Sequence, residues 1–365
     1  MGVAARAAPP VDMAAAGARS FGRRAAVRRP LVLVAGTGAL LLVVVVVGAA
    51  LGAVAVPLDQ TAAILGRRLL GLPFAVTWPA SAETIVLELR LPRVLTAMVV
   101  GGGLAVTGAA LQGLLRNPLA DPYVLGTSSG AALGAAIGIL IPFRVLFLDF
   151  GLVHVLAFAG ALAAVLTVER LSRRGTLASL TGLLLTGYAV SSLLAAGLAL
   201  VMYASGQSLR QIFFFLLGSF DGSTWLRLAG AAPIVLVGVL LIALRARALN
   251  ALLLGEDGAA HLGLEVGRER TILLVLASLV TAAGVAVSGL IGFVGLVVPH
   301  AVRLLVGPNA RAVVPASLVM GAAFLGLADL VSRLAGEIPV GVVTAIVGAP
   351  FFLYLLGRAR TGYEL

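Results

Sequence analysis

The chain alternates long apolar runs with short polar connections, and this alternation predicts its architecture. Residues 31–56 form a run of 26 positions without a charged side chain, whereas a helix needs about 20 apolar residues to cross a bilayer. Because the run is too long for the apolar core of a signal peptide, we expect it to remain as the first transmembrane helix. Nine further runs follow at residues 91–115, 124–142, 151–168, 180–203, 226–244, 271–291, 293–306, 312–330 and 339–357. The pattern predicts an all-α, polytopic membrane protein with about ten transmembrane helices.

Three segments depart from this regular pattern. The run 293–306 is short and contains Pro299, so we expect a partial or broken helix that neighbouring protein shields from lipid. Residues 205–218 are too few to cross the membrane and predict a short helix at the outer mouth. Residues 249–270 alternate apolar and polar groups around glycine, which predicts two short cytoplasmic helices with an apolar face for a partner protein.

The composition supports a membrane environment. Hydrophobic residues make up 61% of the 365 positions and charged residues 11%, with a mean hydropathy of +1.12. Soluble domains carry about 25% charged residues. So few charges could not cover the surface of a water-soluble protein of this length, and lipid must be the solvent for most of the chain. The 45 glycines fit this environment, because membrane helices use glycine for close backbone contact.

The basic residues narrow the functional classes. All 26 of them are arginine, whereas a nucleotide-binding P-loop needs a lysine, so the chain is not a P-loop ATPase. The chain also lacks cysteine, which excludes disulfides, zinc–thiolate sites and iron–sulfur clusters. A net charge of +11 raises the question of nucleic-acid binding. We expect none, because the arginines lie at the ends of apolar runs, where membrane topology explains them.

The arginines also orient the chain in the membrane. With the N-terminus in the cytoplasm, 18 arginines fall on the cytoplasmic side and 8 on the outer side, in agreement with the positive-inside rule. Ten crossings then place both termini in the cytoplasm of a multi-pass protein of the cytoplasmic membrane. We expect residues 1–29 to form a disordered, arginine-rich tail, residues 30–358 to form the transmembrane domain, and residues 359–365 to form a cytoplasmic C-terminal tail.

Two segments of the chain resemble each other. Gly103–Gly108 reads GLAVTG and Gly284–Gly289 reads GVAVSG, and in both copies a proline, Pro118 or Pro299, lies 15 residues after the first glycine. The two copies fall in the second and seventh runs, which cross the membrane in opposite directions. This favours an inverted repeat of runs 2–5 and 7–10. Chance is the alternative in a chain so rich in glycine, alanine and valine.

A few polar residues suggest chemistry, each with a structural alternative. Gly126–Gly130 reads GTSSG, which matches the G-x-S-x-G pattern of a serine nucleophile with Ser128 at its centre. That pattern acts at a strand-to-helix turn, which we do not expect here, and close packing of small residues is the alternative. The three histidines, His154, His261 and His300, are too scattered for a metal cluster. We expect no catalytic residue and no resident metal site, and a transient cargo ligand is the alternative for a histidine.

Charged residues at the ends of the runs allow two interpretations. Asp329 ends the ninth run, where a buried carboxylate is a functional candidate, but it can equally pair with Arg333, four residues on. Arg90 and Arg93 begin the second run on the outer face, and Arg333 precedes the tenth. These arginines are either interfacial side chains or a docking site for carboxylates of a partner. The turn from Asn117 to Pro122 contains two prolines, which make it rigid and suited to a gate.

Four segments carry long, ordered motifs: RLPRVLTAMVVGGGLAVTGAALQGLLRNPLADPYVLGTSSGAALGA (90–135), LLLGEDGAAHLGL (252–264), GFVGLVVPHAVRLLVG (292–307) and DLVSRLAGEIPVGVVTAIVGAPFF (329–352). They resemble the permeases of type II ATP-binding-cassette importers for iron siderophores, haem and cobalamin. The resemblance covers roughly residues 31–358. It implies ten helices per subunit and a second permease subunit, most simply a second copy of this chain, with the translocation path between them.

The resemblance also implies further partners. Two separate ATPase subunits would bind ATP and magnesium on the cytoplasmic side, and an extracytoplasmic substrate-binding protein would deliver the cargo. The permease itself would hold no cofactor and catalyse no covalent reaction. It would move the cargo by alternating access between states that differ in their contacts.

Particular residues match the family's functional elements. The loop 250–265 matches the coupling element that transmits ATPase motion, with residues Gly255, Glu256, Asp257, Ala259 and Gly263. The residues that match the family's docking positions for the binding protein are Arg90, Arg93 and Arg333. The inner gate region matches Asn117 and Leu119, and a second gate element matches Leu180 and Thr181. Candidates for cargo contact at the mouth of the path are Gln207, Ser208 and Arg210.

Two other functions stay open at this point. A stand-alone secondary transporter needs membrane-embedded ionisable groups, for which the runs offer Asp329. An intramembrane serine protease would use Ser128. Iron–siderophore, haem and cobalamin are alternative cargoes, and the second permease subunit is either the same chain or a related one.

Overall fold

The computed structural model describes residues 36–141, 150–172 and 180–359. The chain divides into two units, Met1–Val43 and Val44–Leu365. The described residues of the first unit are helical. The predicted N-terminal tail and, apart from Ala359, the predicted C-terminal tail lie outside the described residues.

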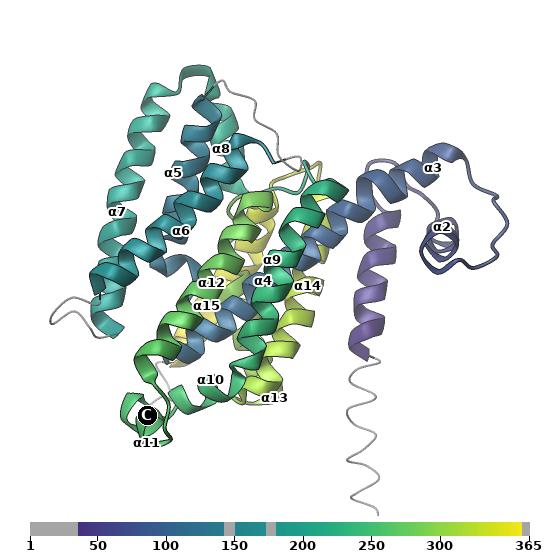
Figure 1. Ribbon diagram of the computed structural model, residues 1–365. Helices are drawn as coiled ribbons and strands as arrows, with labels where there is room; N and C mark the ends of the chain where they lie inside the picture. Colours follow the sequence, from purple (N-terminus) through teal and green to yellow (C-terminus); the bar gives the residue numbers. More distant parts are fainter. Residues whose placement is uncertain (1–35, 142–149, 173–179, 360–365) are drawn as a thin grey trace, which may run out of the picture. The chain divides into compact units, whose positions relative to one another are not determined.

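Helices joined by short connections build the described chain (Figure 1). The first is Gly36–Ala50. The others, in chain order, are α2 (Leu58–Leu70), α3 (Ala80–Thr84), the π-helical turn η1 (Ile85–Arg90), α4 (Leu91–Leu114), the 3₁₀ turn η2 (Pro122–Leu125), α5 (Thr127–Leu140), α6 (Leu152–Ser172), α7 (Leu180–Ala204), the 3₁₀ turn η4 (Gly206–Ser208), α8 (Leu209–Leu217), α9 (Trp225–Leu244), α10 (Ala246–Leu252), α11 (Glu256–His261), α12 (Val266–Ser288), α13 (Val294–Val306), α14 (Ala310–Leu334) and α15 (Val340–Ala359).

Each of the ten predicted runs overlaps a helix of the described chain. Six helices are long and apolar enough to cross a membrane, and four shorter apolar helices, α5 and α13 among them, complete the set. The prediction of an all-α protein with about ten membrane helices is therefore confirmed. The short elements expected outside these runs are present as α8 and as the pair α10 and α11.

The second crossing helix begins earlier than predicted, at Ala80, because α3, η1 and α4 are continuous. Pro92 lacks an amide hydrogen, and its ring conflicts with the carbonyl group four residues earlier. The widened turn η1 relieves this conflict, since the amide of Leu91 bonds to the carbonyl of Val86, five residues back. The helix thus continues through a proline and several charged residues that hydropathy alone assigns to an exterior connection.

Helix α4 is the centre of the described bundle. It packs against α14, α12, α13 and α9 (Figure 1), and nearly all of its residues are buried. Helices α4 and α14 cross at Gly101 and Gly321, where a Cβ atom on either residue would overlap the carbonyl oxygen of the other. Only glycine allows two helix backbones to approach this closely.

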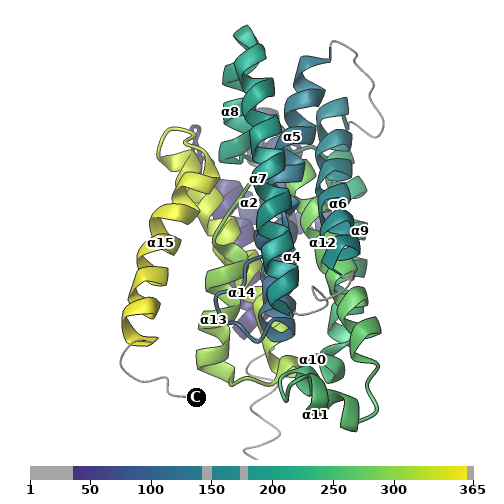
Figure 2. The same cartoon turned by 90° about the vertical axis from the view of Figure 1, so that its left-hand side faces the viewer.

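Helices α5, α6 and α7 form a second group. Helix α5 packs closely on α6, and their backbones meet at Gly130 and Gly160. Helix α12 joins the two groups, because it packs on α6 as well as on α4. Figure 2 shows α15 beside α13 and α14, which are its principal helix neighbours.

The packing agrees with the predicted inverted repeat. Helices α4 and α14, the second and ninth crossings, form one extensive pair, and the equivalent crossings of the other repeat, α12 and α6, are also paired. The two copies of the repeated motif make the same side-chain bond. The hydroxyl of Thr107 donates to the carbonyl of Gly103 at 2.9 Å, and the hydroxyl of Ser288 donates to that of Gly284 at 2.9 Å.

Helix α13 is short, as predicted, but it is continuous across Pro299. Because proline has no amide hydrogen, the carbonyl of Gly295 loses its partner within the helix. The side-chain amide of Gln112 on α4 donates to this carbonyl at 3.4 Å and to that of Leu296 at 3.1 Å. The oxygen of Gln112 accepts a hydrogen bond from Arg303 in return. A single glutamine therefore satisfies polar groups of α13 that lipid could not.

Candidate functional site

The helices α10 and α11 form a compact element between the crossing helices α9 and α12 (Figures 1 and 2). Gly255 precedes α11 with a φ of +95°, and Gly263 follows it with a φ of +79°. Residues with a side chain rarely adopt this backbone conformation. The two glycines therefore provide the sharp turns that bring α11 back against the bundle.

The coupling residues predicted from sequence lie together on this element. Ala259 is fully buried in the main core, whereas the side chains of Glu256 and Asp257 are exposed. Two large apolar residues beside them, Leu254 and Leu262, are 67% and 66% exposed. The element thus anchors itself through one small residue and presents a mixed apolar and acidic surface.

Hydrogen bonds connect this element to the bundle. The side-chain amide of Asn250 on α10 donates to Asn309 at 2.9 Å, and its oxygen accepts from the amide of Ala310 at 2.7 Å. Asn309 caps the start of α14. An ion pair between Arg245 and Glu269 joins the start of α10 to α12. These contacts attach α10 to the start of α14, which packs along α4, and to α12.

Arg90 and Arg333, both predicted docking residues, are 7% and 6% exposed. The guanidinium of Arg90 donates to the carbonyl groups of Ala49, Ala50 and Val54. That of Arg333 donates to Gly48 and Leu51, each at 2.8 Å. These oxygens lie at and just beyond the end of the first described helix, where carbonyl groups lack intrahelical partners and cations are favoured. Both arginines stabilise this helix end.

Arg93 connects the interior to the surface. Its Nε donates to Asp329 at 2.9 Å, and Asp329 also accepts from Nε of Arg333 at 3.1 Å. The carboxylate of Asp329 is completely buried. The other two nitrogens of Arg93 form ion pairs with Asp221 at 2.8 Å and with Glu337 at 3.0 Å, and both of these acids are exposed. The alternative in which Asp329 pairs with Arg333 is thus observed.

The docking role of the three arginines remains a prediction. The structure adds that Arg90 and Arg333 point to internal acceptors, whereas Arg93 has partners that reach the outer surface. Sequence reasoning missed Asp221 and Glu337 as members of this cluster. The only available signal was their position in polar connections flanking predicted runs.

The predicted inner gate lies in the connection between α4 and α5. Asn117 is exposed, and its side-chain oxygen accepts from the amide of Leu119 at 2.9 Å, which tightens the turn. Asp121 likewise accepts from the amide of Tyr123 at 2.8 Å. Burial raises the pKa of the Asp121 carboxyl to about 6, because the loss of hydration outweighs this hydrogen bond. At the second gate element, Leu180 begins α7 and Thr181 is exposed.

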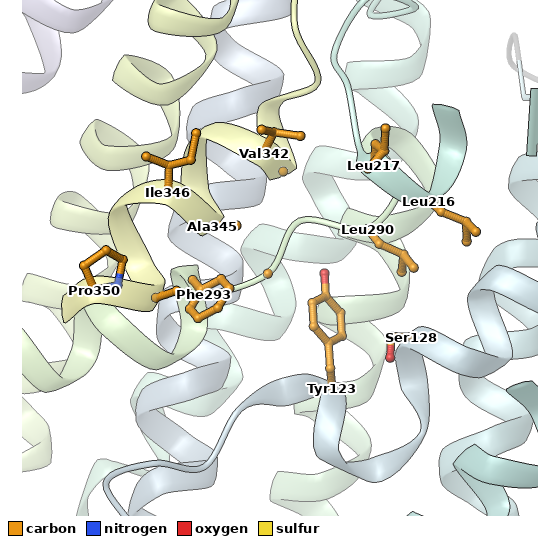
Figure 3. Close-up of a pocket in the computed structure, with 13 residues that line it drawn as sticks. Tyr123, Ser128, Leu216, Leu217, Leu290, Phe293, Val342, Ala345, Ile346 and Pro350 are labelled. Atoms are coloured by element: carbon orange, nitrogen blue, oxygen red, sulfur yellow. The ribbon is translucent and has the colours of Figure 1, made fainter. Parts of the chain in front are cut away.

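A cavity of about 810 Å³ opens next to this connection (Figure 3). Apolar residues of α8, α15 and the connection from α12 to α13 form most of its wall, including Leu217, Phe293 and Ile346. Tyr123 and Ser128 are the polar side chains among its lining residues. The wall therefore offers few polar groups to a molecule inside the cavity.

Tyr123 joins the two repeats at this cavity. Figure 3 shows its ring pointing toward the connection that contains Leu290 and Phe293. The hydroxyl group donates to the carbonyl of Ile291 at 3.1 Å and accepts from its amide at 3.2 Å. Phe293 follows with a φ of +68°, a strained value for a residue with a side chain. Sequence reasoning missed Tyr123, whose signal was a lone phenol within an otherwise apolar segment.

Of the predicted cargo-contact residues, Gln207 and Ser208 lie in η4, and Arg210 lies at the start of α8. Gln207 and Arg210 are exposed, and Ser208 is half-buried. The guanidinium of Arg210 lies 5.5 Å from the ring centre of Phe214, a cation–π distance that orients the side chain. Phe213, 54% exposed, lies beside this pair. These residues provide cationic and aromatic groups on the same short helix.

The cavity does not resemble a hydrolytic site. Ser128 lines it, but none of its lining residues among the described positions is a histidine or a carboxylate. Nδ1 of His154 accepts from the amide of Gly151 at 3.2 Å, and His300 packs edge-on against Phe351. His261 is exposed at the end of α11. Within the described residues no group of three metal-binding side chains occurs.

These features define a polytopic α-helical membrane protein, with an exposed element on α10 and α11 and an apolar cavity beside the contact between Tyr123 and Ile291. Comparison with known proteins then identifies its family. Residues 40–358 match the sequence profile of the FecCD transport family, and the chain belongs to this family. The resemblance noted from the sequence motifs is confirmed.

Individual relatives agree with this assignment. The chain is 47% identical over 279 residues to the cobalamin import system permease protein BtuC of Halobacterium salinarum, which covers 76% of this chain and 74% of the relative. It is 42% identical over 300 residues to the hemin transport system permease protein HmuU of Yersinia pestis, covering 80% and 90%. A solved structure described as an inward-facing ABC transporter of the metal-chelate type matches with a TM-score of 0.77 and 31% identity, covering 89% of this chain and 99% of that one.

Proposed function

We propose that this chain is the membrane-spanning permease subunit of an ATP-binding-cassette importer and that its cargo is an iron chelate, with haem or cobalamin as alternatives. The family supports the permease role, and the names of the relatives support a bulky metal complex as cargo. Two separate ATPase subunits would bind ATP and magnesium, and a substrate-binding protein would deliver cargo from outside. Both termini of the chain would lie in the cytoplasm.

The element formed by α10 and α11 carries this proposal. It exposes Leu254 and Leu262 beside the carboxylates of Glu256 and Asp257, in a segment too short to cross a bilayer. Exposed leucines next to acids suit a protein partner better than lipid. Because the chain contains no lysine, ATP hydrolysis falls to such a partner, and the hydrogen bonds from α10 to α14 transmit its motion.

The exposed surface of α7 supports the proposal that a second permease subunit lies beside it, most simply a second copy of this chain. Much of its surface is exposed, including Tyr188 and Tyr203 at 75% and 92%. Buried phenol groups prefer a polar partner at one end, so a protein or a water-lined path suits this face better than lipid tails. In alternating access, Asn117 and Leu119 of one gate element and Leu180 and Thr181 of the other would separate and close in turn.

Two observations disfavour the alternative functions. A secondary transporter needs a carboxylate that can take up and release an ion, whereas Asp329 is fully buried between two guanidinium groups. A serine protease needs a general base near Ser128, and the described cavity wall provides none.

The test reconstitutes the chain in proteoliposomes with the ATPase of the same transport system. Uptake of a ferric siderophore, haem and cobalamin is measured with and without ATP. We expect uptake of one cargo that requires both the ATPase and ATP. Uphill uptake by the chain alone would overturn the proposal in favour of a secondary transporter.

A matched pair of variants tests the coupling element. Leu262→Ser removes an exposed apolar side chain from the end of α11, and Leu69→Ser removes one that is 58% exposed on α2. We expect Leu262→Ser to lower cargo-stimulated ATPase activity roughly tenfold, as for an interface residue worth about 1.4 kcal/mol. The control should leave this activity unchanged. Equal activity of both variants would remove the coupling role of α11.

A further inference from the structure

Three carboxylates of the chain itself form ion pairs with Arg93, which we predicted as a docking residue on the outer face. Asp329 is completely buried and forms part of the fold. Asp221 and Glu337 differ, because their side chains are 60% and 47% exposed while Arg93 itself is 11% exposed. The two acids therefore lie over the outward side of a guanidinium that is otherwise enclosed.

Arg93 binds one buried carboxylate and two exposed carboxylates. Nε binds the buried Asp329, whereas the two terminal nitrogens, Nη1 and Nη2, face Asp221 and Glu337. Exposed ion pairs contribute little stability, because water solvates both partners well. Nη2 is also buried without a hydrogen bond of good geometry, although the Glu337 carboxylate lies 3.0 Å away. An incoming carboxylate could therefore bind this fork better than Glu337 does.

The backbone at Glu337 is under strain. Glu337 has a φ of +60° and follows Gly336, whose φ is +87°. Glycine tolerates this region, but a glutamate there is disfavoured unless its surroundings hold it. Arg333 also attracts the Glu337 carboxylate, but the described ion pair that holds this side chain is with Arg93. Its loss would allow the turn between α14 and α15 to relax.

We propose that Asp221 and Glu337 act as internal substitutes for the carboxylates of a docking protein, and that the docking protein must displace them from Arg93. This inference rests on the proposed function, since it assumes that an acidic extracytoplasmic binding protein docks on the outer face. It assigns to the two acids a regulatory role: they weaken docking and keep Arg93 neutralised in the free permease.

Displacement of the two acids would affect segments that line the cavity. Asp221 lies in the connection from α8 to α9, and Glu337 lies in the turn before α15. The two segments are joined by a hydrogen bond of 3.0 Å from the amide of Val340 to the carbonyl of Gly218. Their neighbours Leu217 and Val342 line the cavity. Docking would therefore loosen the outer wall of the cavity, where cargo must enter.

The test uses the complete complex of permease and ATPase in lipid nanodiscs, with the labelled binding protein of the same transport system as probe. The variants are Glu337→Gln, Asp221→Asn and both together. Glu88→Gln serves as the matched control. Glu88 is an exposed acid near the start of the crossing helix that carries Arg93, and it is not among the ion partners of Arg93.

We expect each single variant to bind the probe about two- to fivefold more tightly at low ionic strength, as the loss of one exposed competing ion pair predicts. The double variant should bind more tightly still, and Glu88→Gln should bind as the unchanged complex does. In a second measurement, hydrogen exchange at residues 335–339 should accelerate when the probe binds the unchanged complex.

The outcomes separate this inference from the proposed function. Unchanged or weaker binding by the double variant, with docking to the unchanged complex intact, overturns the role of the two acids alone. Slower exchange at residues 335–339 on docking does the same. If the probe fails to bind the unchanged complex in any nucleotide state, the proposed function and this inference both fail.

Discussion

The hydroxyl group of Tyr123 and the backbone of Ile291 exchange two hydrogen bonds, with distances of 3.1 and 3.2 Å, and so connect the two repeats beside the cavity. Tyr123→Phe keeps the ring but leaves the amide and carbonyl of Ile291 unpaired. Since an unsatisfied buried polar group costs about 1–3 kcal/mol, the apparent thermal midpoint of the purified protein should fall by several degrees. Tyr188→Phe on the exposed face of α7 is the control, and an equal midpoint for both variants would contradict the prediction.

The glycine contact between α4 and α14 predicts a second stability effect. Gly101→Ala places a methyl group on the carbonyl oxygen of Gly321, and forced separation of packed elements costs about 1–3 kcal/mol. Gly267→Ala, near the start of α12, meets nothing within 4 Å and should stabilise by up to about 1 kcal/mol through helix propensity. Thermal scans of the two variants should therefore shift in opposite directions. A shift of the same sign for both would refute the contact.

The buried carboxylate between two arginines predicts a third effect. Asp329→Asn leaves Arg93 and Arg333 without their shared buried anion, and such a loss costs about 3–5 kcal/mol. We expect little folded protein in the membrane fraction. Asp59→Asn, which changes an exposed acid of α2, should accumulate normally. Normal yield and thermal midpoint of Asp329→Asn would show that the ion pairs contribute little to the fold.

The connection between α4 and α5 predicts a pH dependence. The pKa of Asp121 rises from its ordinary value of 3.8 to about 6 in the folded chain, so the folded state binds this proton more tightly than the unfolded state does. Stability is therefore highest below pH 4 for this group and falls as the pH rises toward 6, by about 1–2 kcal/mol once partial hydration is allowed for. Asp121→Asn should lose this part of the dependence. The comparison is the difference in thermal midpoint between pH 5 and pH 7 for the two proteins.

Hydropathy predicted the crossing helices well, because the length and apolarity of each run are properties of local sequence. It placed the start of the second crossing helix at residue 91 rather than at Ala80, where the continuous helix of α3, η1 and α4 begins, since charged side chains before Pro92 resembled an exterior loop. Their neutralisation depends on distant groups. Arg90, for example, binds carbonyl groups about 40 residues away in the chain.

The candidate site was predicted only where local sequence determines the structure, and not where it depends on contacts between distant residues. The alternation of apolar and polar groups around glycine predicted two short helices at residues 249–270, which the structure contains as α10 and α11. The coupling role came from the family resemblance and stays a prediction. The partners of Arg93 could not be inferred, since Asp329 lies 236 positions away. Gln112 was also missed, although a single amide side chain in an apolar membrane run is a signal for a buried polar contact.

The bond between Gln112 and the carbonyl of Gly295 limits how this protein can change shape. Pro299 has removed the internal partner of that carbonyl, so separating α4 from α13 would strand a bare oxygen in hydrocarbon, at a cost of several kcal/mol. These two helices must therefore travel together as one rigid block during each transport cycle. Opening and closing are left to the parts of the chain that do not share this bond, among them α7, α8 and α15.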